Sequence, residues 1–291
     1  MTSVIIGCSG ASEIARKIAR RLHLPYSKLS AEKFPDRELH VGFNTSIKGK
    51  IVFLVQSFYN NISDKILEVL FAAQTAKDLG ASKVMLIAPY FPYLRQDKRF
   101  KEGESISAKI VAKIFSKVDK VFIVEPHAHR LKRFKDFFPN AVKISAADVI
   151  AGYIKKKFDD YVLIGPDEES SNWIIPISKQ LSIEPIILRK KRLGPKSVKI
   201  LSSLNKEKKV KIAIIVDDII STGDTMVEAG KEAKKIAETI HYIGIHGILV
   251  GDAMKKLRKQ GEVVSCNSIP SSASKIDLSK AISDEIKRFA K

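Results

Sequence analysis

Residues 212–225 of this 291-residue chain, which read IAIIVDDIISTGDT, decide its fold. Residues 212–216 are a short β-branched run, and such runs are typical of strands that a parallel sheet buries on both faces. Beyond residue 225, apolar side chains recur at spacings of three and four, which predicts one face of a helix. The residues of that face are Met226, Ala229, Ala233, Ile236 and Ile240. The stretch therefore predicts a buried strand, a short polar loop and then a helix.

The polar loop of this stretch suits a phosphate group. It lies where the carboxyl end of a strand meets a helix N-terminus, so unpaired backbone N–H groups and the helix dipole favour an anion there. Ser221, Thr222 and Thr225 add hydroxyl donors. Gly223 lets the backbone approach the anion closely.

Two adjacent carboxylates, Asp217 and Asp218, precede this loop. They would repel a phosphate, but they suit sugar hydroxyls or a bridging magnesium ion. A ligand with phosphate at one end and a diol at the other fits both parts, which indicates ribose 5-phosphate. The alternative is that the Asp pair caps a turn and that residues 221–225 are an N-cap cluster. Capping alone explains adjacent carboxylates after a buried strand poorly, and the segment resembles the phosphoribosyl pyrophosphate motif of the phosphoribosyltransferase superfamily.

Length, composition and cysteine content limit the class of protein. A chain of 291 residues suggests about two domains, and 45% hydrophobic residues exclude a mostly disordered chain. No apolar run approaches the roughly 20 residues of a membrane-spanning helix. The chain enters a strand directly after its first residues, without a signal-peptide pattern, and its two cysteines lack metal-ligand spacing. We therefore expect a cytoplasmic protein without a membrane partner.

The net charge of +19 raises the alternative of a nucleic-acid-binding protein. The lysines, however, are spread along the chain, and the sequence has neither an RNA-binding aromatic motif nor zinc-finger spacing. A lysine-rich, solvated surface around a polyanionic substrate explains the charge better. We therefore expect no nucleic-acid partner.

Strand patterns alternate with helical patterns along the chain, which predicts an α/β fold with mostly parallel sheets flanked by helices. The clearest predicted strands are residues 4–6, 51–55, 84–88, 121–124, 161–164, 185–188, 212–216 and 242–250. The two halves follow similar plans, so we predict two similar domains, 1–146 and 147–276. A final helix within 277–291 is expected to pack back on the first domain.

Further polar clusters lie in the predicted connections. Residues 34–38 follow the first helix, and residues 90–99 mix aromatic side chains with guanidinium and amide donors that suit a base and phosphates. His127 and Asp167 each follow an apolar strand and together could hold magnesium. A purely structural role is the alternative for residues 90–99 and for His127. Residues 189–192, Arg-Lys-Lys-Arg, are either a solvated charge run or a basic loop that closes over a transferring phosphoryl group.

These segments, in this order, resemble the ribose-phosphate pyrophosphokinase family, also called the phosphoribosyl pyrophosphate synthetases, in its compact archaeal type. The resemblance covers nearly the whole chain and implies two phosphoribosyltransferase-type domains. The implied ATP-binding residues are Phe34, Asp36, Glu38, Arg95, Gln96 and Asp97. The implied ribose 5-phosphate-binding residues are Asp217, Asp218, Ser221, Thr222, Gly223, Asp224 and Thr225. The implied metal ligands are His127 and Asp167, and the implied catalytic residues are Lys190 and Arg192.

The resemblance also implies a reaction. The pyrophosphoryl group of Mg-ATP would move to the C1 hydroxyl of ribose 5-phosphate, giving 5-phosphoribosyl 1-pyrophosphate and AMP. The first domain would bind ATP, the second would bind ribose 5-phosphate, and Mg²⁺ would be the cofactor. Adenine contacts in this family can come from a neighbouring subunit, which implies at least a homodimer. The alternatives are an ordinary phosphoribosyltransferase, which needs only the second-half motif, and a catalytically silent partner subunit.

The chain departs from the family pattern at several positions. Pro35 and Arg37 replace other residues of the family's Phe-Ser-Asp-Gly-Glu loop. Residues 168–171, Glu-Glu-Ser-Ser, stand where bacterial-type members have glycines, so we expect a different shape for the pyrophosphate loop. The basic loop also permits a shift of one residue, which makes Lys191 a rival to Lys190 as the catalytic lysine.

Overall fold

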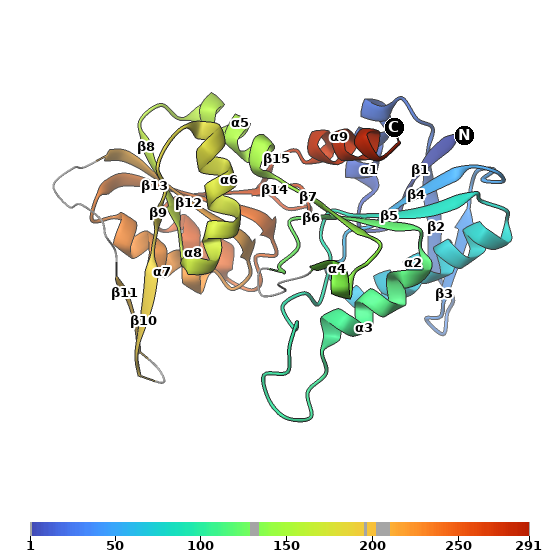
Figure 1. Ribbon diagram of the computed structural model, residues 1–291, viewed down its shortest axis with the longest axis horizontal. Helices are drawn as coiled ribbons and strands as arrows, with labels where there is room; N and C mark the ends of the chain where they lie inside the picture. Colours follow the sequence, from blue (N-terminus) through green and yellow to red (C-terminus); the bar gives the residue numbers. More distant parts are fainter. Residues whose placement is uncertain (1, 129–133, 195–196, 202–209, 291) are drawn as a thin grey trace. The chain divides into compact units, whose positions relative to one another are not determined.

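The computed structural model describes residues 2–128, 134–194, 197–201 and 210–290 and confirms the predicted α/β fold (Figure 1). The chain divides into two compact units, each with its own mostly parallel sheet. Unit 1 comprises residues 1–145 and 278–291, and unit 2 comprises residues 146–277. No helix within the described residues is long and apolar enough to cross a membrane.

Unit 1 is built on a seven-stranded sheet in the order β3-β2-β1-β4-β5-β6-β7. Its strands are β1 (Ser3–Gly7), β2 (Tyr26–Lys33), β3 (Leu39–Phe43), β4 (Ile51–Val55), β5 (Lys83–Ala88), β6 (Lys120–Val124) and β7 (Ala141–Ile144). Its helices are α1 (Ser12–Leu22), α2 (Ile62–Asp78), α3 (Ser107–Ile114), α4 (Phe134–Phe137) and α9 (Ser279–Ala290). Only the β2–β3 pair, a hairpin at the edge, is antiparallel among these described strands.

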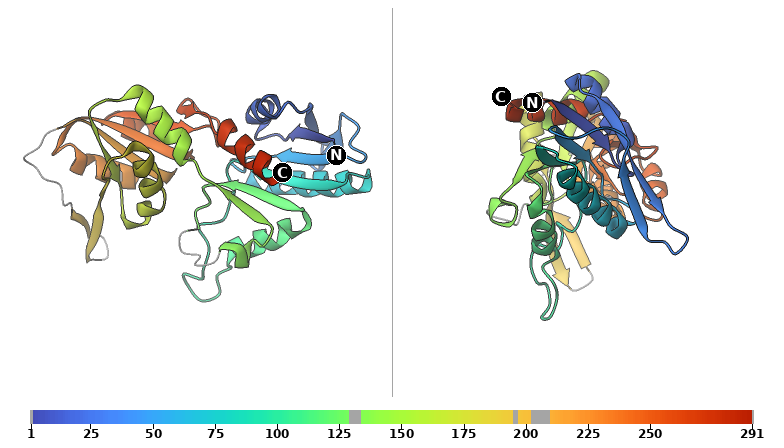
Figure 2. Two further views of the ribbon diagram at one scale, coloured as in Figure 1. Left: turned by 45° about the horizontal axis from the view of Figure 1, so that its top comes forward. Right: turned by 90° about the vertical axis from the view of Figure 1, so that its right-hand side faces the viewer.

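Alternation along the strands of unit 1 supplies two apolar faces. One face includes Val52 and Leu86 and forms a core with α2 and α3. The other face carries Phe53 and lies under α1 and α9 (Figure 2). The last helix joins this layer although it is far from α1 in sequence, and Arg21 Nε donates to Ser279 Oγ over 2.8 Å.

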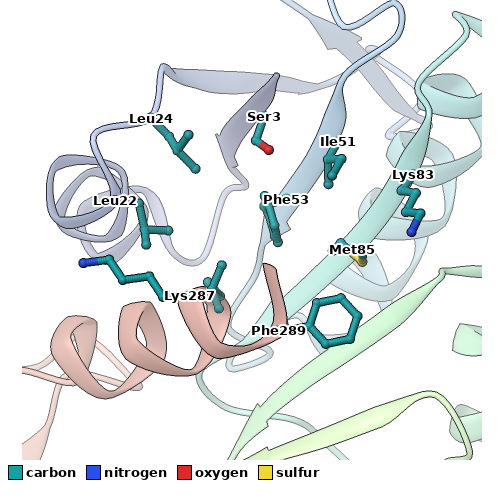
Figure 3. A pocket seen from close by; sticks show the side chains of 10 residues that line it. Ser3, Leu22, Leu24, Ile51, Phe53, Lys83, Met85, Lys287 and Phe289 are labelled. Carbon is teal, nitrogen blue, oxygen red and sulfur yellow. The ribbon is translucent and has the colours of Figure 1, made fainter. Parts of the chain in front are cut away.

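A cavity of about 460 Å³ lies between α9 and this second face of the sheet. Figure 3 shows Phe53 and Met85 from the strands, Leu22 from α1 and Phe289 from α9 around it. Because β1, β4 and β5 line it with residues at or near their amino ends, the cavity is remote from the loops that follow these strands.

Unit 2 is built on a six-stranded parallel sheet in the order β15-β14-β13-β12-β8-β9. Its strands are β8 (Tyr161–Gly165), β9 (Ile186–Ile187), β12 (Val210–Ile220), β13 (Ala237–Gly247), β14 (Glu262–Cys266) and β15 (Ser274–Ile276). Its helices are α5 (Ala147–Lys157), α6 (Ser171–Leu181), α7 (Asp224–Ala233) and α8 (Ala253–Arg258). Strands β10 (Arg189–Gly194) and β11 (Ser197–Leu201) form a separate antiparallel pair that extends away from the sheet (Figure 1).

The two sheets share one strand order. The run β2-β1-β4-β5-β6-β7 of unit 1 recurs in unit 2 as β9-β8-β12-β13-β14-β15. Both units also have an antiparallel pair near their second strand. In unit 1, β3 follows β2 and pairs with it; in unit 2, β10 and β11 follow β9 and pair with each other. Strand β1 therefore corresponds to β8, and β4 corresponds to β12.

The structure corrects the sequence prediction around the Asp pair. Asp217 and Asp218 lie within β12 rather than after it, because β13 pairs with β12 as far as Ile220 and Gly247. The predicted helix also ends early, at Ala233, and β13 begins at Ala237. Ile236 and Ile240, which continue the helical spacing, are buried in the turn and in β13 instead.

Candidate functional site

The loop between β12 and α7 is compact and well defined. It comprises residues 221–223, and Gly223 caps the helix with a φ of 79°, a left-handed conformation that glycine adopts without strain. A Cβ at Gly223 would also touch Leu257 and Ala253, because the loop packs closely against α8. Ser221 is half-buried and accepts a hydrogen bond at its backbone oxygen from the Val250 N–H over 3.0 Å. The loop is thus held by its neighbours before any ligand arrives.

The Asp pair on β12 is buried at the carboxyl end of the sheet. Asp217 is 9% exposed and Asp218 is 5% exposed. The Asp218 N–H donates to Asp217 Oδ1 over 3.0 Å, which orients that carboxylate. Trp173 of α6 donates its indole N–H to the Val216 carbonyl over 3.1 Å. The hydrogen bond from α6 therefore fixes the part of β12 that carries the Asp pair.

The helix end of the loop carries a charge pair that the sequence did not predict. Lys256 of α8 lies 3.3 Å from Asp224 Oδ1 and 3.1 Å from Asp252 Oδ1. The Thr222 hydroxyl and the Lys256 ammonium hold the pKa of the Asp224 carboxyl below its usual value. The only sequence signal for Lys256 is its spacing of four from Asp252, which predicts a helical pair but not a contact with the loop.

A second loop of unit 2 follows the neighbouring strand β8. Asp167 is half-buried, and its carbonyl accepts from both the N–H and the hydroxyl of Ser170. Residues 168–170 form a 3-10 turn, so the Glu-Glu-Ser departure gives a tight turn directly before α6. Gly165 is required at the strand end, because a Cβ there would collide with the Ser170 side chain. Since β8 and β12 are parallel neighbours, Asp167 and the Asp pair lie at the same edge of their sheet.

In unit 1, residues 34–38 form the turn of the β2–β3 hairpin rather than a plain connection after the first helix. The Phe34 N–H donates to the Glu38 carbonyl over 2.9 Å, and the Glu38 N–H donates to Asp36 Oδ1 over 3.1 Å. Arg37 has a φ of 74°, which explains why a glycine suits this position of the family loop. Phe34 is 52% exposed, so its ring is available for stacking.

Residues 95–97 lie in the long connection between β5 and α3. Arg95 and Gln96 are exposed, whereas Asp97 is buried. Gln96 is tied to the start of α3, since its side-chain oxygen accepts from the Ser107 hydroxyl over 2.6 Å. Exposed Arg and Gln side chains suit contacts with phosphates, and the buried Asp97 is better placed to brace the loop.

His127 is half-buried in unit 1 after β6, and Asp167 belongs to unit 2. In the part of the chain that the structure describes, no three His, Cys, Asp or Glu side chains gather into a metal-binding group. The buried carboxylates of Asp217 and Asp218 are oxygen donors of the kind that a hard cation prefers.

The predicted basic loop is a β-hairpin. Lys190 pairs with Ile200 and Arg192 pairs with Val198 along β10 and β11. The side chains of Lys190, Lys191 and Arg192 lie outside the described part of the structure, so their predicted roles stay predictions. The sequence missed the hairpin because its β-branched partner strand, residues 197–201, follows a charge-rich segment without an apolar run.

Two family models and several relatives match the chain. Residues 3–118 match the model described as the N-terminal domain of ribose phosphate pyrophosphokinase, and residues 140–276 match the phosphoribosyl transferase domain. The chain is 35% identical to the ribose-phosphate pyrophosphokinase of Methanothermobacter thermautotrophicus, over 98% of this chain and 100% of that protein. It is 33% identical to the enzyme of the same name from Methanobrevibacter smithii, with the same coverage.

A solved structure shares the fold along the full length. The phosphoribosylpyrophosphate synthetase from Mycobacterium smegmatis superposes with a TM-score of 0.85 at 23% identity, covering 99% of each chain. At that identity the likeness establishes the arrangement of strands and helices. It agrees with the two sheets described above.

Proposed function

This chain belongs to the ribose-phosphate pyrophosphokinase family and makes phosphoribosyl pyrophosphate from ATP and ribose 5-phosphate, and from this premise we propose that unit 2 holds the ribose 5-phosphate and unit 1 holds the ATP. The observation that carries the assignment is the buried Asp217–Asp218 pair followed by the short loop that opens α7. Unit 1 carries instead the exposed ring of Phe34 in the turn between β2 and β3 and the exposed guanidinium of Arg95 after β5.

In unit 2, two kinds of group recognise the two ends of the sugar phosphate. The 5-phosphate is bound by loop amides and by the hydroxyls of Ser221, Thr222 and Thr225, at the positive end of the α7 dipole. Asp217 and Asp218 accept hydrogen bonds from the ribose hydroxyls. Asp224 supports the loop through its contact with Lys256. This arrangement leaves the C1 hydroxyl as the free end of the sugar.

In unit 1, the ATP contacts come from two connections. Phe34 stacks on the adenine, while Asp36 and Glu38 accept hydrogen bonds from its exocyclic amino group. Arg95 and Gln96 donate to the phosphates, and Asp97 holds their loop in shape. The turn that carries Phe34 projects from a sheet edge and leaves the ring half exposed, so we propose that it serves a neighbouring subunit in at least a dimer.

Magnesium fits the donor set of unit 2. The buried carboxylate oxygens of Asp217 and Asp218 are of the kind that Mg²⁺ prefers. Asp167 of the same unit and His127 of unit 1 are the further candidate ligands. The bound ion would neutralise phosphate charge and orient the polyphosphate chain. Asp167 would meet the ion at the strand-end edge that it shares with the Asp pair.

The β10–β11 hairpin would supply the catalytic cations. Lys190 and Arg192 would neutralise charge that develops on the β-phosphoryl oxygens as the C1 hydroxyl attacks and AMP leaves. No covalent intermediate with the protein is required, because positioning and electrostatic stabilisation are sufficient for such a displacement.

The decisive experiment is a product assay with ATP, ribose 5-phosphate and Mg²⁺ that separates AMP from ADP. We expect ribose-dependent AMP together with phosphoribosyl pyrophosphate. ADP as the nucleotide product would identify a simple kinase that uses the same pocket. An absence of nucleotide turnover would contradict the assignment and favour a phosphoribosyltransferase or a silent subunit.

A further inference from the structure

The shared strand order makes it possible to compare the two units position by position. At the strand ends of unit 1, Gly7 of β1 pairs with Val55 of β4. At the strand ends of unit 2, Ile164 of β8 pairs with Ile215 of β12. The next residue along each of these two strands is again glycine and valine, at positions 165 and 216. The segments that follow these glycines and valines are therefore equivalent.

This equivalence places Gln56 and Ser57 of unit 1 where unit 2 has Asp217 and Asp218. All four residues are buried. This strand end of unit 1 therefore has an amide and a hydroxyl in place of the carboxylate pair that could hold ribose hydroxyls or a cation. Both groups donate hydrogen bonds as well as accept them.

A carboxylate from elsewhere in unit 1 reaches this position. Glu68 lies on α2 and is only 3% exposed. Its Oε1 accepts from the Ser9 N–H over 2.7 Å, and its Oε2 accepts from the Ser9 hydroxyl and, over 2.9 Å, from Gln56 Nε2. Gln56 Oε1 in turn accepts from the Gly10 N–H over 2.8 Å. Three donors from two strand-end loops thus converge on one buried anion.

The two loops around Glu68, which follow β1 and β4, pack tightly against each other. A Cβ at Gly10 would lie 2.4 Å from the Ser57 carbonyl oxygen, so only glycine allows the approach. Lys65, one helical turn before Glu68, donates to the Tyr59 carbonyl over 2.7 Å and interacts electrostatically with the carboxylate. The site has the donors and the cation of an anion-binding cradle, with the anion supplied by the chain itself.

We propose that unit 1 retains an anion-binding cradle equivalent to the substrate-binding edge of unit 2, and that Glu68 fills it as a built-in anion. The comparison with unit 2 rests on the proposed function, but the cradle itself is defined by its own contacts. The ligand class is a small carboxylate. When the Glu68 carboxylate is removed, the cradle should bind such an anion from solution in its place.

The test is chemical rescue of the Glu68→Ala variant. Alanine keeps Cβ, so the missing atoms correspond to those of acetate. We expect the variant to melt roughly 5 °C or more below the unmodified chain, because buried donors lose their acceptor. Sodium acetate should raise its melting temperature by about 3 °C more than sodium chloride at equal ionic strength. Circular dichroism follows the transition.

Val69→Ala is the matched control, because it truncates the adjacent buried residue of α2 without removing a charge. Neither this variant nor the unmodified chain should distinguish acetate from chloride. An equal response of Glu68→Ala and Val69→Ala would overturn the proposal and leave Glu68 as an ordinary structural residue. The AMP assay of the unmodified chain is independent of this result, so failure of the cradle and failure of the proposed function are distinguishable.

Glu68→Gln keeps the proposal testable even where the alanine variant does not fold. Glutamine preserves the shape of the side chain but replaces one acceptor oxygen with a donor that faces other donors. We expect a melting temperature lowered by roughly 3 °C or more and no response to acetate, because the space stays filled. A glutamine variant as stable as the unmodified chain would show that the cradle does not need an anion.

Discussion

At the scale of single residues, the buried Asp pair supports the sharpest prediction about activity. Asp218→Asn keeps the size of the side chain but removes the negative charge that we propose accepts a hydrogen bond from a ribose hydroxyl. We expect kcat/KM for ribose 5-phosphate to fall roughly 10²-fold, with little change in melting temperature. Steady-state AMP formation measures the effect. The exposed carboxylate of Asp159 provides the control, and Asp159→Asn should retain full activity.

A second residue-scale prediction concerns pH and the cluster of His241, Glu262 and Lys157 in unit 2. His241 Nδ1 lies 3.1 Å from Glu262 Oε2, and Lys157 Nζ donates to the same carboxylate over 2.8 Å. Burial lowers the pKa of His241 below its usual 6.5. The hydrogen bond from Lys157 lowers the pKa of Glu262 below 4.5.

The direction of the pH effect follows from these shifts. Below pH 6.5, His241 binds a proton more readily in the unfolded chain than in the folded chain. The free energy of unfolding therefore decreases as the pH decreases, before Glu262 begins to titrate. We expect His241→Gln to reduce this loss between pH 7 and pH 5, by at most about 1.4 kcal/mol per pH unit. Urea unfolding followed by the fluorescence of Trp173, the single tryptophan, reports on unit 2. Parallel pH profiles of the two proteins would contradict the prediction.

The sequence predicted which residue types gather at the site better than it predicted their conformations. The Asp pair, the hydroxyl-rich loop and Gly223 were recognisable because their chemistry is local in sequence. The positive φ of Arg37 and the contact of Lys256 with Asp224 depend on a hairpin turn and on a neighbouring helix. Glu68 carried no signal at all, since a single acidic residue in a helical pattern is typical of a solvated face.

At the scale of elements, the β10–β11 hairpin carries the next prediction. Lys190→Ala and Arg192→Ala should each lower kcat on the order of 10²–10³-fold, with small changes in KM, because the two cations are proposed to act on charge that develops in the transition state. Lys191→Ala is the matched control within the same strand. If Lys191→Ala carries the loss and Lys190→Ala does not, the loop is shifted by one residue. Near-normal turnover in both Lys190→Ala and Arg192→Ala would refute the assignment.

The α9 helix allows a prediction about stability. Ile282 is fully buried where α9 packs in unit 1, so Ile282→Ala should lower the free energy of unfolding of that unit by about 2–5 kcal/mol. Phe289→Ala, near the exposed end of the same helix, should cost less because the ring is already partly solvated. Thermal unfolding by circular dichroism compares the two. Equal losses would contradict the prediction and mean that the partly exposed ring stabilises unit 1 as much as the buried side chain does.

Element boundaries were the least predictable feature. The helical spacing from Met226 to Ile240 fits a helix by pattern alone, yet α7 ends at Ala233. The pairing of β12 with β13 decides the outcome, because Ile240 is opposite Ala213 in the sheet. The same pairing extends β12 through the Asp pair. Such long-range contacts are not encoded in local periodicity.

At the scale of the whole molecule, the repeated strand order could not be derived from residue similarity. The equivalent positions Gln56–Ser57 and Asp217–Asp218 differ in chemistry, as does the origin of the nearby anion. The sheet order survives because it depends on apolar strands, which tolerate exchange among similar residues. We attribute the different polar residues at the strand ends to the different substrates that the two units are proposed to bind. The sequence therefore predicted two similar domains without revealing their one-to-one correspondence.

The proposed assembly supports a final prediction that uses two chains, each impaired at a different part of the site. Phe34→Ala should weaken ATP binding, and Asp218→Asn should disable the ribose 5-phosphate site. If the Phe34 turn of one subunit serves the site of its neighbour, a mixed assembly contains one site with an intact turn and an intact Asp pair. Mixing the two variants and allowing subunits to exchange should then restore AMP formation to about a quarter of the unmodified activity in a randomly assorted dimer. Activity that stays at the mean of the separate variants, with exchange verified by mass, would place Phe34 and Asp218 of one chain in the same site.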